Sequence, residues 1–203
     1  MTQKPLIVGI TGGIGSGKST VARFLRAQGY KVYDSDLEAK KIQNTDAKVR
    51  AATIQLFGNK AYTGNEMNRP FVAKRVFEDK NLLKKLNEIV HPAVKNDFLM
   101  WVKENKNEKI LFIESAILFE SGFNSLVDKV LLISASKETR IYRVMKRDGV
   151  TRENVIQRIE NQTNMEDLKQ RADIVLYTDD DIPMTVKIFI LLRKLLNQNL
   201  QNT

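Results

Sequence analysis

Short apolar runs alternate along the chain with longer segments whose apolar residues recur at helical spacing. Five runs have the length of a strand: residues 5–10, 30–36, 109–115, 128–134 and 172–177. Runs that are apolar throughout, rather than at every second position, are typical of strands buried on both faces of a parallel sheet. The sequence therefore predicts an α/β fold in which helices flank a parallel sheet.

One connection between the runs is too long for an ordinary crossover. Residues 37–108 separate the second run from the third, whereas a crossover needs roughly a dozen residues. Most of this stretch has a helical pattern, which turn-forming residues interrupt at 58–70. We expect an inserted helical sub-domain here, and a second helical excursion at residues 136–162. The nucleotide-binding core would then consist of the remaining segments: 1–36, 109–135 and 163–203.

A glycine-rich segment, GITGGIGSGKST at residues 9–20, follows the first run. Gly12-x4-Gly17-Lys18-Ser19 matches the P-loop pattern, and a strand before it with a helix after it is the expected context. Glycines let backbone N–H groups approach phosphate oxygens, Lys18 can reach the β- and γ-phosphates, and the Ser19 hydroxyl can ligate Mg²⁺. The dinucleotide fingerprint G-x-G-x-x-G does not fit, so the segment predicts a nucleoside triphosphate site rather than a glycine-rich turn without a ligand.

A P-loop indicates what is bound, not which reaction follows. A regulatory GTPase would be expected to carry Asn-Lys-x-Asp, and neither Asn-Lys pair, at 59–60 or 105–106, continues in that way. A motor or assembly ATPase would usually show a strand that ends in Asp-Glu, whereas the third run ends in a lone Glu114. Phosphoryl transfer to a small acceptor, held by the helical insert, is the reading that remains.

Asp34 and Asp36 stand at the C-terminal end of the second run, at the sheet edge where ligands bind in α/β folds. On an extended segment they would point to the same side, about 6–7 Å apart. One could lie near the Mg²⁺ shell while the other accepts the proton of an attacking hydroxyl. The alternative is a capping role, since Asp-Ser-Asp before a helical pattern suits an N-cap.

Arg140, Arg143 and Arg147 fall on one face of a predicted helix in the second excursion. Guanidinium groups bind phosphate oxygens in pairs and stabilise a transferring phosphoryl group, although a solvated helix face is the usual reading of such a row. An excursion that closes over the nucleotide would keep water from competing with the acceptor. His91 precedes Pro92 at a predicted helix end and by itself indicates a structural boundary.

Charge and composition narrow the class of protein. Among 203 residues, 33 Lys and Arg against 24 Asp and Glu give a net charge of +9, which favours anionic partners or simply keeps the surface soluble. The absence of cysteine excludes disulfides and thiolate metal sites, and one histidine makes a histidine-based zinc site unexpected. We find no membrane-spanning or targeting segment, so we expect a cytoplasmic protein with no membrane association.

In combination and order, these motifs resemble the dephospho-coenzyme A kinase family over nearly the whole chain. The resemblance rests on GITGGIGSGKST, YDSD, the helical insert with His91-Pro92, AILFE at 116–120, RVMKRDG at 143–149, RIENQ at 158–162 and RADIVL at 171–176. It implies a P-loop kinase that phosphorylates the ribose 3′-hydroxyl of dephospho-CoA to give coenzyme A, the last step of CoA biosynthesis. Mg²⁺ would be the cofactor and ATP the co-substrate, with residues 37–108 as the acceptor (CoA) sub-domain and 136–162 as a lid.

The resemblance also implies roles for particular residues. Catalysis would fall to Lys18, Asp36 and Arg147. ATP would contact Gly13, Ile14, Gly15, Ser16, Gly17, Lys18, Ser19, Thr20 and Arg143. The acceptor would contact Asp34, Asp36, His91, Leu118, Phe119, Glu120, Arg158 and Gln162. Ser19 would be the protein ligand of the metal.

Three positions depart from the family pattern. Glu114 stands where the family usually has Asp, and its extra CH₂ leads us to leave it out of the metal ligands. Ala116 replaces a proline, and Tyr177-Thr178-Asp179 lacks the Asn and Gly often found after the last strand, so the contacts to adenine stay open.

Two alternatives to this function remain open at this point. A kinase of another nucleoside or nucleotide would share the same motifs. A non-catalytic nucleic-acid-binding module would fit the positive charge, but the aromatic residues are not interleaved with the basic ones. We expect ATP and dephospho-CoA as partners, no nucleic acid, and a monomer or weak homo-oligomer.

Overall fold

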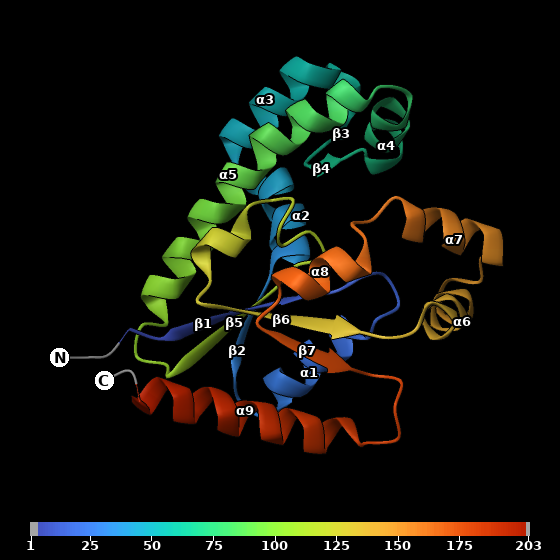
Figure 1. Cartoon of the computed structure of the whole chain (residues 1–203). Helices are drawn as coiled ribbons and strands as arrows, with labels where there is room; N and C mark the ends of the chain where they lie inside the picture. The colour runs from blue at the N-terminus through green and yellow to red at the C-terminus, as the bar shows by residue number, and fades with distance from the viewer. Residues whose placement is uncertain (1–3, 202–203) are drawn as a thin grey trace. The chain divides into compact units, whose positions relative to one another are not determined.

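The computed structural model describes residues 4–201, and the side chains of residues 4–197 (Figure 1). The chain forms two compact units. One, the α/β unit, contains the residues up to Tyr33 and those from Asn105 onward, and the other, the helical unit, is Asp34–Glu104. Among the described residues, no helix is both long and apolar enough to cross a membrane.

A five-stranded sheet forms the centre of the α/β unit. Its strands lie in the order β2-β5-β1-β6-β7, and the pairs of β1 with β5, β1 with β6 and β6 with β7 are parallel. The bounds are β1 Leu6–Thr11, β2 Lys31–Asp34, β5 Ile110–Glu114, β6 Lys129–Ser134 and β7 Ile174–Tyr177. The predicted parallel sheet is confirmed.

Helices and a long loop cover both faces of this sheet, so its central strands are apolar throughout. α1 (Lys18–Ala27) and α9 (Met184–Gln201) pack on one face, where Val8, Ile10 and Phe112 contribute to the main core. The predicted packing of the C-terminal helix on the sheet is thereby confirmed. α8 (Met165–Arg171), which the sequence pattern did not reveal, lies on the other face together with η2 (Phe123–Leu126) (Figure 1).

Two helices between β6 and β7 enclose a small core of their own. α6 (Lys137–Asp148) and α7 (Arg152–Glu160) correspond to the predicted excursion. Ser136 and Thr151 cap their N-termini by accepting the amides of Thr139 and Asn154. Apolar side chains lie between the two helices: Ile141, Val144 and Val155 at the centre, with Ile14, Val150, Ile156 and Ile159 packed against them.

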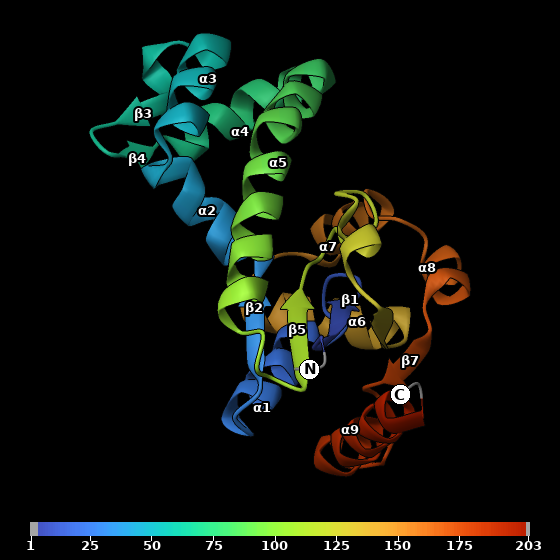
Figure 2. The same cartoon turned by 90° about the vertical axis from the view of Figure 1, so that its left-hand side faces the viewer.

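The helical unit packs three helices around a fourth long one. Its elements are α2 (Ser35–Thr45), α3 (Ala47–Phe57), η1 (Asn59–Ala61), β3 (Tyr62–Thr63), β4 (Glu66–Met67), α4 (Arg69–Glu78) and α5 (Lys80–Glu104). α5 packs against α2, α3 and α4, as Figure 2 shows. The turn-forming stretch 58–70 contains a short antiparallel hairpin, whose Tyr62 ring lies 4.3 Å under the Arg50 guanidinium.

The second predicted strand is shorter than its apolar run. β2 ends at Asp34 and α2 begins at Ser35, so Asp34 and Asp36 do not share an extended segment, and the prediction that they do is wrong. The Asp34 carboxylate accepts the Leu37 amide at 3.0 Å, which satisfies one of the N–H groups exposed at the start of a helix. The capping alternative therefore holds for Asp34, and Asp36 lies in the first turn of α2.

His91 and Pro92 do not mark a helix end, which corrects a second prediction. Both lie inside α5, and Pro92 removes one backbone hydrogen bond from it. The buried residues Leu86, Val90, Val94 and Phe98 recur every four positions across the proline. Burial of this continuous stripe outweighs the roughly 3 kcal/mol that a proline costs inside a helix, so the helix continues.

Candidate nucleotide-binding site

The carboxyl ends of four strands of the α/β unit converge on one edge of the sheet. β1 leads into the P-loop, β5 ends at Glu114, β6 at Ser134 and β7 at Tyr177. From β1 the chain crosses to β2 on one side, while β6 lies on the other side of β1. Open α/β sheets bind their ligands at such a reversal of strand order.

Two glycines of the P-loop occupy positions that no larger residue could fill. Gly12 has φ 154°, and a Cβ there would come within 2.3 Å of the Ile133 carbonyl oxygen. Gly15 has φ 78°, and a Cβ there would come within 2.5 Å of the Arg140 carbonyl oxygen. The loop is therefore fitted closely between β6 and α6.

The P-loop ends at a helix N-terminus suited to an anion. Gly17 is the N-cap of α1 and provides no capping side chain, and the first turn of α1 contains no acidic residue. The Ser16 hydroxyl is buried and has no hydrogen-bond partner among the side chains that the structure describes. Unpaired helix N–H groups and a buried, unpartnered hydroxyl fit phosphate oxygens.

Glu114 connects the two polar residues at the end of the P-loop. Ser19 Oγ donates to Glu114 Oε1 at 2.7 Å, and Lys18 Nζ lies 3.9 Å from the same oxygen. Arg26 Nη2 lies 3.9 Å from Glu114 Oε2. The side chain of Glu114 is buried, so the two cations offset the cost of holding its charge away from water.

The residues around Ser19 fit Mg²⁺. A serine hydroxyl beside a buried carboxylate is a hard oxygen donor set of the kind that Mg²⁺ prefers. Within residues 4–197, no three carboxylate or imidazole side chains gather into a metal cage. Mg²⁺ is usually held by one or two protein oxygens, with phosphates and water completing its shell.

Thr178 fastens the end of β7 to the P-loop and to α6. Its hydroxyl donates to the Ser16 carbonyl oxygen at 2.7 Å. Arg143 donates to both oxygens of Thr178, Oγ1 and the carbonyl oxygen, each at 2.7 Å. Neighbouring Asp179 accepts the Ser136 amide at 2.7 Å, which lowers the pKa of its carboxyl. The segment that lacks the family's Asn and Gly therefore still closes this side of the loop.

A cavity of about 680 Å³ opens above the P-loop, a size suited to a small ligand. It brings together all the predicted ATP-binding residues, Gly13–Thr20 and Arg143, with two further predicted site residues, Arg147 and Gln162. The remaining lining residues are Arg23, Ala116, Val144, Thr178 and Met184.

Asp148 pairs with two of the predicted site arginines. Arg147 donates from Nε to Asp148 Oδ1 at 2.7 Å, and Arg158 donates from Nη1 to Asp148 Oδ2 at 2.9 Å. These arginines lower the pKa of the Asp148 carboxyl, Arg147 contributing most. Arg147 is exposed and borders the cavity, whereas Arg158 is absent from its lining.

The predicted acceptor residues of the loop after β5 have partners within the α/β unit. Leu118 is fully buried, and its side chain packs against Gly9 of β1, so it serves the core and offers no surface to a ligand. The Arg171 guanidinium lies 3.8 Å from the centre of the Phe119 ring. Glu120 accepts a hydrogen bond from the Thr163 hydroxyl.

The helical unit holds the other three predicted acceptor residues. Asp34 caps α2, Asp36 is exposed in its first turn, and His91 is half-buried on α5. Burial and the nearby Lys95 ammonium lower the pKa of the His91 imidazole, which keeps it neutral at neutral pH. A cavity of about 490 Å³ lies in this unit, with Asp46, Pro92 and Asp97 among its lining residues.

Sequence reasoning missed two residues of the site, Glu114 and Thr178. Glu114 was set aside as a departure, although a lone carboxylate at the end of a buried strand was a usable signal. Thr178 lies in the segment after the last strand, for which the sequence analysis noted only the lack of the family's Asn and Gly. Arg140, which the sequence placed on one helix face with Arg143 and Arg147, is buried against the P-loop rather than solvated.

Known proteins match this chain over most of its length. The family model described as Dephospho-CoA kinase matches residues 6–183. Curated proteins named dephospho-CoA kinase are 37% identical over 185 residues in Bacteroides fragilis, covering 91% of this chain and 90% of that protein, and 43% identical over 169 residues in Porphyromonas gingivalis, covering 83% of each.

Solved structures have the same fold. The crystal structure of TT1252 from Thermus thermophilus has a TM-score of 0.81 and 35% identity, over 97% of this chain and 98% of that chain. Dephospho-CoA kinase from Campylobacter jejuni has a TM-score of 0.64 and 24% identity, over 96% and 94%. Shikimate kinase from Acinetobacter baumannii, at 0.55 and 16% over 95% and 94%, resembles this chain in fold alone.

Proposed function

The chain belongs to the dephospho-CoA kinase family, and on this premise we propose that it transfers the γ-phosphoryl group of ATP to the ribose 3′-hydroxyl of dephospho-CoA. A bond forms between the 3′-oxygen and the γ-phosphorus, and the bond from that phosphorus to the β-γ bridging oxygen breaks. The products are coenzyme A, ADP and the proton of the hydroxyl. The arrangement of Lys18, Ser19 and Glu114 beneath a P-loop is the observation that carries this proposal.

In this proposal, the P-loop binds the triphosphate. The N–H groups at the start of α1 and the Lys18 ammonium would hold the β- and γ-phosphates. Ser19 would ligate Mg²⁺, with Glu114 holding its hydroxyl in place. Bound Mg²⁺ would neutralise charge that develops on the phosphate oxygens.

We assign Asp36 the role of orienting the 3′-hydroxyl and accepting its proton. A carboxylate with an ordinary pKa near 3.9 is a weak base, but a loose phosphoryl-transfer transition state mainly needs the hydroxyl to be oriented. His91, in the acceptor sub-domain at residues 37–108, remains a candidate contact for dephospho-CoA. Phe119, Glu120 and Arg158, which lie outside that sub-domain, are further candidates.

Residues 136–162 would act as a lid in this reaction. Arg143 and Arg147 border the cavity from α6, and Arg147 would contact the transferring phosphoryl group. Leaving Asp148 would free the Arg147 guanidinium for that contact. Closure would also exclude water, which would otherwise compete with the acceptor hydroxyl.

Acceptor-dependent release of ADP tests the proposal. We would incubate the protein with ATP and Mg²⁺, with and without dephospho-CoA, and identify the product by mass. We expect ADP and coenzyme A to form together, only when dephospho-CoA is present. Folded protein that binds ATP but forms no coenzyme A would contradict the proposed acceptor, and a screen of nucleosides and nucleotides would follow.

A further inference from the structure

Ile14, at the tip of the P-loop, makes three contacts with residues 136–162, of which Gln162 is the last. The Ile14 amide donates to Gln162 Oε1 at 2.8 Å. The Ile14 carbonyl oxygen accepts a hydrogen bond from Arg140 Nε at 2.9 Å. Both backbone groups of Ile14 are therefore hydrogen-bonded to side chains of this segment: Arg140 in the first turn of α6, and Gln162 just after α7.

The side chain of Ile14 provides the third contact. It packs against the small apolar core between α6 and α7, whose centre includes Ile141 and Val155. This contact explains an apolar residue at a position within a run of glycine and serine. Because Ile14 contributes to a core that otherwise belongs to the two helices, the loop and the helices share one packed cluster.

Arg140 lies against three successive residues of the loop, Gly13, Ile14 and Gly15. A Cβ on Gly13 would come within 2.7 Å of Arg140 Nη2, and a Cβ on Gly15 would come within 2.5 Å of the Arg140 carbonyl oxygen. Only 5% of Arg140 is exposed. Burial lowers the pKa of its guanidinium, but from a value far above neutral, so the group stays charged. Among the side chains that the structure describes, no carboxylate pairs with Arg140, so its hydrogen bond to the Ile14 carbonyl oxygen offsets part of the cost of burying the charge.

From these contacts we infer that Arg140 and Gln162 are positioning residues that fix the Ile14 peptide and thereby hold the phosphate-binding loop in its bound shape. They also attach the first turn of α6 and the end of the lid segment to the loop. The resemblance implied that Gln162 contacts the acceptor. The structure instead directs its side-chain oxygen to the P-loop amide.

The positioning role predicts which substrate's binding should change when Gln162 is substituted. A residue that shapes the phosphate cradle affects the binding of ATP and ADP. A residue that contacts the acceptor affects the KM for dephospho-CoA. Substitution by Met keeps the length of the side chain and removes the oxygen that Ile14 needs. Gln157, exposed on α7, offers the same substitution as a control.

The experiment compares Gln162→Met with Gln157→Met in three measurements. Amide hydrogen exchange at Ile14 should become more than tenfold faster in Gln162→Met, while amides in β1 keep their protection. Calorimetric titration with ADP and Mg²⁺ should give a Kd about tenfold higher. The KM for ATP should rise to a similar extent, with the KM for dephospho-CoA unchanged, and Gln157→Met should match the wild type throughout.

Two results would overturn the inference. One is unchanged exchange at Ile14 in Gln162→Met. The other is a raised KM for dephospho-CoA with normal ADP binding, which would return Gln162 to the acceptor site.

Only the kinetic part of the experiment rests on the proposed function. If the wild type makes no coenzyme A, that function fails, while amide exchange at Ile14 and the affinity for ADP still test the positioning role. Arg140→Lys keeps the positive charge but loses the planar guanidinium group, and it should also weaken ADP binding. If Arg140→Lys does not fold, the measurements on Gln162→Met alone decide whether the inference holds.

Discussion

At the scale of single residues, the chemistry of the site depends on a few side chains and their polar partners. Glu114 occupies the end of β5, where a carboxylate can reach both Lys18 and Ser19. Aspartate at the same position would have one CH₂ less with which to reach Ser19. Glu114 in place of the family's usual Asp therefore extends the carboxylate further toward Ser19.

Glu114→Gln tests whether the negative charge of this side chain is needed. The amide keeps the shape of the side chain but loses the charge that faces Lys18 and any cation bound at Ser19. We expect kcat to fall at least tenfold and the Mg²⁺ concentration for half-maximal rate to rise. Steady-state assays across a Mg²⁺ series would measure both, with exposed Glu104→Gln as the control; an unchanged Mg²⁺ response would remove Glu114 from the metal site.

Asp36→Asn separates chemistry from binding. If Asp36 orients the acceptor, its amide variant should lose orders of magnitude in turnover while its Kd for ADP stays within about twofold of the wild type. Asp34→Asn is the matched variant, because asparagine also caps helices and should preserve α2. Normal turnover in Asp36→Asn would take this residue out of the mechanism.

His91 predicts a dependence of stability on pH. Its pKa in the folded protein lies below the ordinary 6.5, so the unfolded chain binds the proton more readily. Its contribution to stability is complete above pH 6.5 and is lost as the pH falls toward the folded pKa, by about 1.4 kcal/mol for each unit by which the pKa is lowered.

Urea unfolding of the wild type and His91→Gln at pH 8 and pH 5 would measure this loss. Because the chain has one histidine, the comparison isolates a single imidazole. The free energy of unfolding of His91→Gln should decline less over this interval. Parallel curves for the two proteins would show that the His91 pKa is not lowered.

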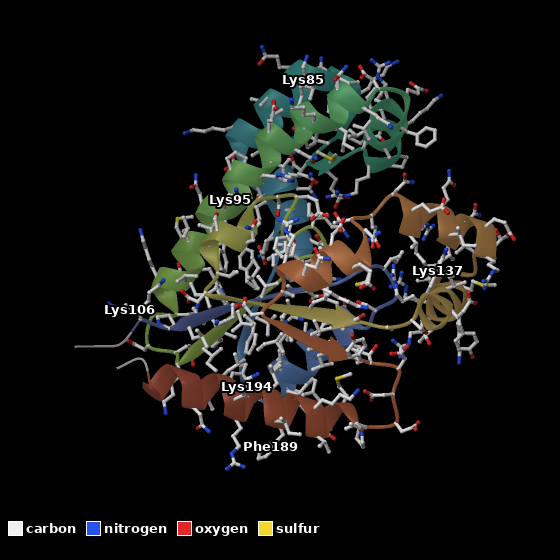
Figure 3. The ribbon with its side chains drawn as sticks, viewed as in Figure 1. Lys85, Lys95, Lys106, Lys137, Phe189 and Lys194 are labelled. Atoms are coloured by element: carbon white, nitrogen blue, oxygen red, sulfur yellow. The ribbon has the colours of Figure 1, made fainter. Side chains whose placement is uncertain are left out.

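At the scale of elements, packing overrides local preference in α5 and agrees with it elsewhere. Asp46 and Asn68 cap α3 and α4 by accepting the first amides, as their residue types predict. Pro92 should end a helix, yet α5 continues through it because its apolar stripe stays buried. α9 combines a buried face with an exposed one, on which Phe189 points away from the sheet (Figure 3).

Pro92→Ala should make the protein more stable. The substitution restores a backbone N–H inside α5, and the gain exceeds the entropy that proline removes from the unfolded chain. We expect the free energy of unfolding to rise by about 1–3 kcal/mol in urea titrations. Asn96→Ala, another exposed position of α5, should raise it by less than about 0.7 kcal/mol. An equal gain in both would mean that Pro92 costs the helix nothing.

At the scale of the whole molecule, the strand order assembles the site from distant segments. Ser19 and Glu114 are 95 residues apart in sequence, and Arg143 and Thr178 are 35 apart. Each pair meets because parallel strands end at the same edge. Binding a nucleotide at that edge should therefore stabilise the fold that creates it.

Thermal unfolding with ADP and Mg²⁺ measures this linkage. At a concentration of 100 Kd, a ligand that binds only the folded state adds about 2.7 kcal/mol, which raises the Tm of a chain this size by roughly 5–10 °C. Lys18→Ala should abolish most of the shift, and exposed Lys106→Ala should retain it. A full shift in Lys18→Ala would show that ADP binds elsewhere than at the P-loop.

The sequence by itself determined the sheet, the P-loop and the family. Apolar runs that are buried on both faces are visible without knowing their neighbours, and the conformations of Gly12 and Gly15 depend on residue type. These properties are local, so pattern and composition sufficed to predict them.

Only the tertiary structure decided which side chains meet. Strand order brought Glu114 to Ser19 and Thr178 to the P-loop, and the packing of α6 and α7 turned Arg140 and Gln162 toward Ile14. It also decided that Asp34 caps a helix and that Pro92 lies within one. Hydrogen bonds and burial across such sequence separations depend on geometry in space, which the local pattern of residues does not contain.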